Sequence, residues 1–152
     1  MPTSSRPLVI GIGNEFRGDD VAGLLAVRAL AALGGHARAD LLEHRGDGAG
    51  LLDAWSGRAR VVLIDAMATS RAPGEVVYLD ASERLPTHEL GGASTHALGP
   101  AQAVEMARAL GQLPARVELY AIAGRHFAMG DDVGAAVRAA ADRVARAVLE
   151  SL

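Results

Sequence analysis

Two continuous apolar runs dominate the hydrophobic pattern of the chain. The first extends from Leu8 to Ile12, and the second, Arg60 to Asp65, is apolar between its two charged ends. Runs of this length without alternation are typical of strands that are buried on both faces. Such strands occur in α/β proteins, in which helices cover both sides of a mostly parallel sheet.

Apolar residues that recur every three or four positions predict helices between these strands. We expect helices from Asp19 to Gly34-Gly35, from Gly48 to Trp55, from Pro100 onward, and from Asp132 to Leu149, with further strands at Ala39–Glu43, Glu75–Leu79 and Val117–Ile122. Asp19 is expected to cap the first helix. Residues 66–74 contain a Pro-Gly turn and no helical pattern, so the strand that follows should be antiparallel.

The order of these elements predicts an α/β fold with three layers. We expect a mostly parallel, twisted, five-stranded sheet with one antiparallel strand and helices on both faces. The 152 residues fit a single domain, residues 1–152. Residues 81–99 form a long polar segment that we expect to be a functional loop.

Composition excludes several classes of chemistry. There is no cysteine and no lysine, which rules out thiolate metal sites, a cysteine nucleophile and a lysine Schiff base. The net charge of −3 gives no basic surface for nucleic acid. No apolar run reaches the ~20 residues of a membrane span. The N-terminus has no signal-peptide pattern, so we expect a cytoplasmic protein.

Acidic residues follow both of the central apolar strands. Asp19 and Asp20 come shortly after the run Leu8 to Ile12, and Asp65 ends the run that begins at Arg60. In open α/β sheets, ligands bind outside the carboxyl ends of the strands. A charge at the end of a buried strand is costly unless it is paired, hydrogen-bonded or bound to metal. We therefore expect Asp20 and Asp65 to be site residues, with Asp19 mainly a helix cap.

Two converging carboxylates need a cation, because like charges in one site disfavour each other. A neutral imidazole would complete a three-ligand set that suits zinc, nickel or another divalent metal, since the residue types alone do not choose the metal, and leaves positions open for substrate. His96 is the preferred third ligand because it lies just before the helix at Pro100. His88 and His126 are alternatives, and solvated or capping roles are expected for His36 and His44.

The glycines of Gly11-Ile12-Gly13-Asn14 allow a second interpretation, a nucleotide site. Position 16 is Phe instead of a third glycine, and Glu43 is the only acid near the end of the second strand. Close backbone packing is the simpler explanation for these glycines.

Taken together, the motifs resemble the hydrogenase maturation endopeptidases, which process the large subunit of nickel–iron hydrogenases. The likeness covers Gly11-Ile12-Gly13-Asn14, Asp19-Asp20-Val21-Ala22-Gly23, Val61-Val62-Leu63-Ile64-Asp65-Ala66 and Ser94-Thr95-His96-Ala97-Leu98-Gly99. It implies a twisted five-stranded sheet and a metal site at Asp20, Asp65 and His96. One departure is Gly130-Asp131-Asp132-Val133, where the family resemblance implies a Leu-Ser-Pro-like opening of the last helix.

The resemblance implies an endopeptidase that removes the C-terminal extension of a hydrogenase large-subunit precursor after nickel insertion. Asp20, Asp65 and His96 would bind the nickel that the precursor carries, with Asp19 as a possible proton acceptor. Two other functions remain open at this point. One is a stand-alone metal-dependent peptide or amide hydrolase, and the other is a nickel-site checkpoint or chaperone without enzymatic activity.

Overall fold

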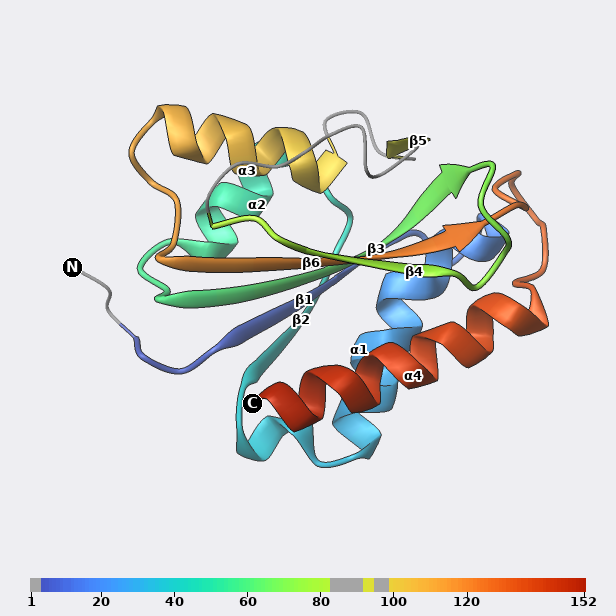
Figure 1. Cartoon of the computed structure of the whole chain (residues 1–152), viewed down its shortest axis with the longest axis horizontal. Coiled ribbons are helices and arrows are strands. Elements are labelled where there is room, and N and C mark those ends of the chain that lie inside the picture. The colour runs from blue at the N-terminus through green and yellow to red at the C-terminus, as the bar shows by residue number, and fades with distance from the viewer. Residues whose placement is uncertain (1–3, 83–91, 95–98) are drawn as a thin grey trace.

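The computed structural model of the chain describes residues 4–82, 92–94 and 99–152 (Figure 1). In chain order, the elements are β1 (Leu8–Ile12), the 3-10 helix η1 (Gly18–Val21), α1 (Ala22–Ala32), the 3-10 helix η2 (Gly35–Ala37), β2 (Asp40–His44), α2 (Gly48–Trp55), β3 (Arg60–Thr69), β4 (Val76–Asp80), β5 (Gly92–Ser94), α3 (Gly99–Ala109), β6 (Arg116–Gly124) and α4 (Ala135–Ser151).

The sheet has the strand order β2-β1-β3-β6-β4, and β5 pairs with β3 outside this path. Strands β1, β2, β3 and β6 run parallel, whereas β4 is antiparallel to β6. This five-strand path confirms the predicted fold class. The sixth strand, β5, is short and antiparallel, and it lies within the segment 81–99 that the sequence indicated as loop.

Helices cover both faces of the sheet, as the continuous apolar strands require (Figure 1). On one face, α1 and α4 pack side by side against Val9, Val62 and Ile64. On the other face, α2 and α3 pack against the alternate strand residues, among them Ile10 and Leu63. Both faces of β1 and β3 are therefore dry, which explains why these strands lack the alternating polar positions of an exposed sheet.

Strand β3 is longer than predicted, and this changes the setting of Asp65. The sequence indicated a strand that ends at Asp65, but β3 continues to Thr69. It continues because β6 pairs with it as far as Ala68 and β5 pairs with residues 67–69. Asp65 therefore lies inside a paired strand.

Two predicted helix starts were wrong. Asp19 does not cap the first helix, because residues 18–21 form η1 and α1 begins at Ala22. The last helix begins at Ala135, three residues later than expected, and its N-cap is Gly134. The Asp19 side chain accepts hydrogen bonds from the segment before α4 instead of from its own helix.

Gly23 lets α1 lie directly on the ends of β1 and β3. A Cβ atom at this position would lie 2.3 Å from both the Ile12 and the Ile64 carbonyl oxygens. These are backbone atoms of two buried strands and cannot move aside.

Gly23→Ala is expected to lower the free energy of unfolding by about 3 kcal/mol, since overpacking a rigid core typically costs 1–3 kcal/mol. Gly34→Ala is the matched control, because Gly34 has φ +86° but open space around it. Its cost should be about 1 kcal/mol. Urea denaturation of both variants measures the difference, and equal losses would show that the close approach at Gly23 is unimportant.

Among the described residues, no helix is long and apolar enough to cross a membrane.

Candidate functional site

The topology defines one crevice at the carboxyl edge of the sheet. From β1 the chain passes through α1, on one face, to β2; from β2 it passes through α2, on the opposite face, to β3. The strand order therefore runs from β1 to β2 on one side and then reverses to β3 on the other side of β1. In open α/β sheets, ligands bind at the switch point, where the strand order reverses. Here that point lies between the carboxyl ends of β1 and β3.

Asp20 reaches this crevice through η1, the turn of 3-10 helix between β1 and α1. Its side chain is buried, with 2% exposed. The 3-10 helix packs against β3. The 3-10 helix also lies close to the end of β1. A Cβ atom added to Gly13, directly after β1, would lie only 2.2 Å from the Asp20 carbonyl oxygen. Asp20 is thus held at the switch point by tightly packed backbone.

Asp65 approaches the same crevice from β3 and is also only 2% exposed. The β1–β3 ladder ends with Gly11 opposite Ile64, so Asp65 is the first β3 residue beyond it. Alternation along the strand places its side chain on the face of Leu63, toward α2 and α3. One of its carboxylate oxygens accepts the Ala66 N–H at 2.8 Å.

The structure thus brings η1, which carries Asp20, against β3, which carries Asp65, at one switch point. His96, the predicted third ligand, lies outside the described residues, as does His88. Within residues 4–82, 92–94 and 99–152, no three His, Cys, Asp or Glu side chains form a group that could hold a metal ion. The described residues therefore do not form a three-ligand metal site by themselves. The metal site of Asp20, Asp65 and His96 stays a prediction.

Asp19 has a different role from its neighbour. It is 1% exposed, and both of its oxygens accept backbone N–H groups from the segment that joins β6 to α4. One oxygen accepts from Arg125 at 2.7 Å and from His126 at 3.0 Å, and the other accepts from Gly134 at 2.8 Å. The Asp19 N–H in turn donates to the His126 carbonyl at 2.7 Å. We call these four hydrogen bonds the Asp19 latch.

The Asp19 latch also sets the protonation of this carboxyl. Burial alone would raise the pKa of Asp19, but the N–H groups of Gly134, Arg125 and His126 outweigh it, so the pKa lies below its ordinary value. A carboxylate with both oxygens occupied and a lowered pKa is a poor proton acceptor. The geometry favours a positioning role for Asp19 over proton transfer.

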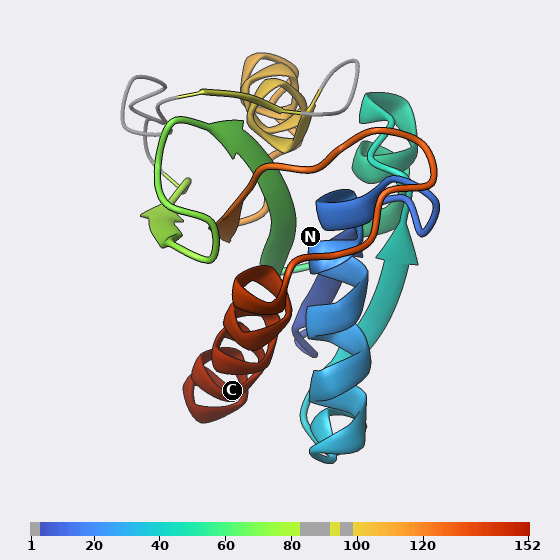
Figure 2. The same ribbon diagram turned by 90° about the vertical axis from the view of Figure 1, so that its right-hand side faces the viewer.

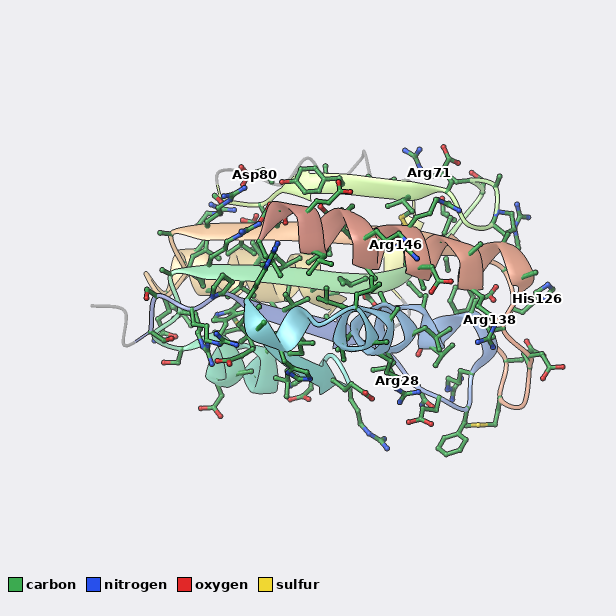
Figure 3. The ribbon with its side chains drawn as sticks, turned by 90° about the horizontal axis from the view of Figure 1, so that it is seen from below. Arg28, Arg71, Asp80, His126, Arg138 and Arg146 are labelled. Atoms are coloured by element: carbon green, nitrogen blue, oxygen red, sulfur yellow. The ribbon has the colours of Figure 1, made fainter. Side chains whose placement is uncertain are left out.

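The remaining described histidines are not placed as ligands. His126 is exposed and lies at the end of the molecule beyond α4 (Figure 3). The Nδ1 atom of His44 accepts the Gly46 N–H at 2.8 Å. His36 lies in η2, which follows the end of α1 that is distant from the carboxyl edge.

A fourth buried acid, Glu118, is explained by structural partners. It receives hydrogen bonds from Arg60 at 2.8 Å and from the Tyr78 hydroxyl at 2.9 Å. It pairs with Val62, near the amino end of β3. Burial and Glu118 together raise the pKa of Tyr78. Glu118 therefore stabilises the sheet at the edge opposite the crevice.

The nucleotide interpretation of the Gly11-Ile12-Gly13 motif finds no support in the geometry. A Cβ atom on Gly11 would lie 2.2 Å from the Gly23 carbonyl oxygen, so this glycine serves the close packing of α1. The α-helix begins only at Ala22, not directly after the glycines. Glu43, the acid that a ribose would need, is bound by Arg28 through two hydrogen bonds of 2.7 and 3.0 Å.

A cleft of about 300 Å³ opens beside the crevice. Its lining residues are Gly13, Asn14, Glu15, Phe16, Leu24, Glu43, His44 and Arg45. Arg28 bridges the carboxylates of Glu15 and Glu43, which raises the pKa of Arg28 and lowers that of Glu43. These charges are partly exposed, so their pairing contributes little stability, but it fixes the loop that follows β1.

Sequence reasoning missed the hydrogen bonds that the segment between β6 and α4 donates to Asp19. In Figure 2 this segment, in orange, runs beside the dark-blue loop after β1. Its contribution is made by backbone N–H groups, which every residue except proline carries, so no residue type could have indicated it. In the sequence, Phe16 only occupies the position where a nucleotide-binding motif would have a third glycine. Its exposure was not predicted.

Comparisons with known proteins agree with this architecture. The family model for hydrogenase maturation proteases (HycI) matches residues 31–151. The [NiFe] hydrogenase maturation protease HybD from Thermococcus kodakarensis superimposes with a TM-score of 0.77 at 28% identity, covering 96% of this chain and 98% of that one. The hydrogenase maturating endopeptidase HybD from E. coli gives a TM-score of 0.78 at 24% identity, with coverages of 97% and 91%. No curated protein matches the sequence significantly.

A third solved structure, the [NiFe] hydrogenase maturation protease HycI from Thermococcus kodakarensis KOD1, has a TM-score of 0.72 at 22% identity, covering 97% of this chain and 92% of that one. At the identities of the E. coli HybD and this HycI, the likeness shows the fold alone. The family model spans most of the chain, including β3 and the segment of His96. The chain belongs to the hydrogenase maturation protease family and is a peptidase.

Proposed function

We propose that this peptidase removes the C-terminal extension of a nickel–iron hydrogenase large-subunit precursor once nickel has been inserted. Asp20, Asp65 and His96 bind the nickel that the precursor presents, and the bond to be cleaved then lies at the carboxyl edge of the sheet. Nickel is in this proposal part of the substrate. We also propose that processing takes place in the cytoplasm, where a chain without cysteine needs no oxidising environment.

The observation that carries this proposal is the pair of buried acids at the switch point. Asp20 and Asp65 come from the two neighbouring elements that flank the crevice, and each is 2% exposed. Two carboxylates that share one region repel each other, and a cation between them offsets this repulsion. A divalent cation supplies that charge, and carboxylate oxygens with one imidazole nitrogen suit nickel.

The register of β5 supports His96 as the third ligand. Ser94 lies opposite Met67, two residues beyond Asp65 in β3. Position 96 is two residues after Ser94, and two residues of extended chain span at most about 7 Å. Because β6 occupies the other edge of β3 as far as Ala68, β5 lies on the edge that β1 vacates at Ile64. The position of Ser94 is therefore compatible with a ligand at position 96.

Selectivity for the nickel-loaded precursor follows from the same charges. With nickel present, each carboxylate gains a cation, and the complex is stabilised. Without nickel, docking leaves the two acids without that cation, and the complex is weaker. Holding the precursor in one orientation supplies part of the rate acceleration, since positioning alone lowers a barrier substantially. A divalent ion beside the bond also polarises a carbonyl group and lowers the pKa of bound water.

Incubation of purified large-subunit precursor with this protein, followed by mass spectrometry, tests the proposal. We expect the wild type to shorten the nickel-loaded precursor and leave the nickel-free precursor intact. Asp20→Asn should slow cleavage by about a hundredfold or more, because it replaces an anionic ligand by a neutral one.

The other outcomes separate the alternatives. Equal cleavage of both precursors by both proteins would contradict a role for nickel and Asp20. Binding of the nickel-loaded precursor without any change in its mass would favour a checkpoint or chaperone. Cleavage of short unrelated peptides by a tightly metal-bound enzyme would favour a stand-alone hydrolase.

A further inference from the structure

Two large apolar side chains are exposed on neighbouring backbone segments near the crevice. Phe16 is 65% exposed and Met129 is 63% exposed, more than any other large apolar residue that the structure describes. They come from different segments, the loop after β1 and the loop before α4. The two segments are joined by a hydrogen bond of 2.8 Å from the Gly130 N–H, directly after Met129, to the Phe16 carbonyl.

The backbone around both residues is fixed. The Phe16 N–H donates to the Asn14 side-chain oxygen at 2.9 Å, so both backbone polar groups of Phe16 are occupied. Asp131 accepts the Ala128 N–H at 3.0 Å, and its own N–H donates to the Ala128 carbonyl at 3.0 Å, which closes the turn that contains Met129. The two side chains are therefore exposed on an ordered surface, and only their apolar atoms are available for contact.

Phe16 also forms part of the wall of the 300 Å³ cleft, together with Leu24. Gly13 lines the same cleft and lies directly against the Asp20 backbone. The cleft is therefore next to the crevice that Asp20 reaches. Arg28 already neutralises part of the charge of Glu15 and Glu43 in this wall. An apolar group can therefore approach Phe16 and Leu24 without leaving an unpaired carboxylate beneath it.

We propose that Phe16 and Met129 bind a large apolar side chain of the precursor polypeptide, in the segment that adjoins the cleaved bond. This inference rests on the proposed function, because it takes the substrate of the crevice to be a polypeptide. Phe16 lines the same cleft as Gly13, which lies against the Asp20 backbone, so an apolar side chain of a polypeptide bound near Asp20 can be placed on Phe16. A phenyl ring supplies apolar area at low entropic cost, and a thioether adapts to the shape of its partner. Phe16 and Met129 thus determine which precursor is accepted.

The test compares Phe16→Ala, Phe16→Leu and Met129→Ala with the wild type on the nickel-loaded precursor. Leu33→Ala is the matched control, since Leu33 is an exposed apolar residue at the far end of α1. Two quantities are measured: the kcat and KM of cleavage, and the affinity for the precursor by isothermal titration calorimetry.

Phe16→Ala should raise KM and weaken affinity about tenfold, the ratio expected when one large apolar side chain is no longer buried. Met129→Ala should do so about threefold, since a more adaptable side chain contributes less per contact. Phe16→Leu should recover most of the loss, and kcat, the thermal unfolding midpoint and the Leu33→Ala control should stay unchanged.

Unchanged KM and affinity in both alanine variants would overturn the inference, as would a fall in kcat alone. If the wild type binds the precursor but does not shorten it, the proposed function fails, and the affinities still decide the role of Phe16. If the wild type cleaves normally and the alanine variants match it, the inference fails and the proposed function stands.

Discussion

Asp65→Asn is expected to abolish processing of the nickel-loaded precursor, with a loss of at least about a hundredfold in rate. The change replaces one carboxylate oxygen by an NH2 group and removes the negative charge that we propose to bind nickel. The remaining carbonyl oxygen still accepts the Ala66 N–H, as the carboxylate does at 2.8 Å. The variant should therefore fold, and the measurement is the rate of mass loss of the precursor.

Glu118→Gln is the matched control for that result. Glu118 is also 2% exposed, but it lies at the opposite edge of the sheet and is bound by Arg60 and Tyr78. Glu118→Gln should lower the free energy of unfolding and leave the rate of precursor cleavage per folded molecule unchanged. If Asp65→Asn were as active as Glu118→Gln, Asp65 would be a structural residue and the proposed site would be wrong.

Asp19→Ala is expected to lower the free energy of unfolding by about 3–5 kcal/mol, the largest stability loss that we predict. Three backbone N–H groups lose a charged acceptor at once, and hydrogen bonds to charged groups contribute roughly 1.5–3 kcal/mol each. The loop before α4 should be released from η1 as a result. Urea denaturation gives the stability, and hydrogen exchange at Arg125, His126 and Gly134 reports the loop.

The pH dependence of this loss identifies the charge as its cause. The pKa of Asp19 is lowered in the folded protein, so its contribution is complete above the unfolded value near 3.8 and disappears as the pH falls through the folded value. The difference between the wild type and Asp19→Ala should be constant above about pH 5 and shrink below about pH 4. A difference that does not change down to pH 2 would show that packing, not the carboxylate, stabilises the latch.

The fold was predictable because its central strands carry an unambiguous pattern. Leu8–Ile12 is apolar throughout and forms β1 with the predicted bounds. The helix between Gly48 and Trp55 was also predicted correctly, since Asp47 and the apolar spacing define it locally. By contrast, the continuation of β3 to Thr69 depends on partners supplied by β5 and β6, which are distant in sequence.

The candidate site was predictable in part, for a related reason. A carboxylate next to a continuous apolar run stands out in any sequence, so Asp20 and Asp65 could be proposed as candidates from the residues alone. The role of Asp19 could not, because a helix cap and a latch to a distant loop require the same residue type at the same position. Only the tertiary contact with residues 125–134 distinguishes them.

The central claim is that Asp20, Asp65 and His96 bind one divalent ion together. A crystal structure of the protein with nickel, located by anomalous scattering at the nickel edge, tests it most directly. We expect one ion at the carboxyl edge between β1 and β3, bound by oxygens of Asp20 and Asp65 and a nitrogen of His96. An ion bound elsewhere, or one at this edge that lacks either carboxylate, would contradict it.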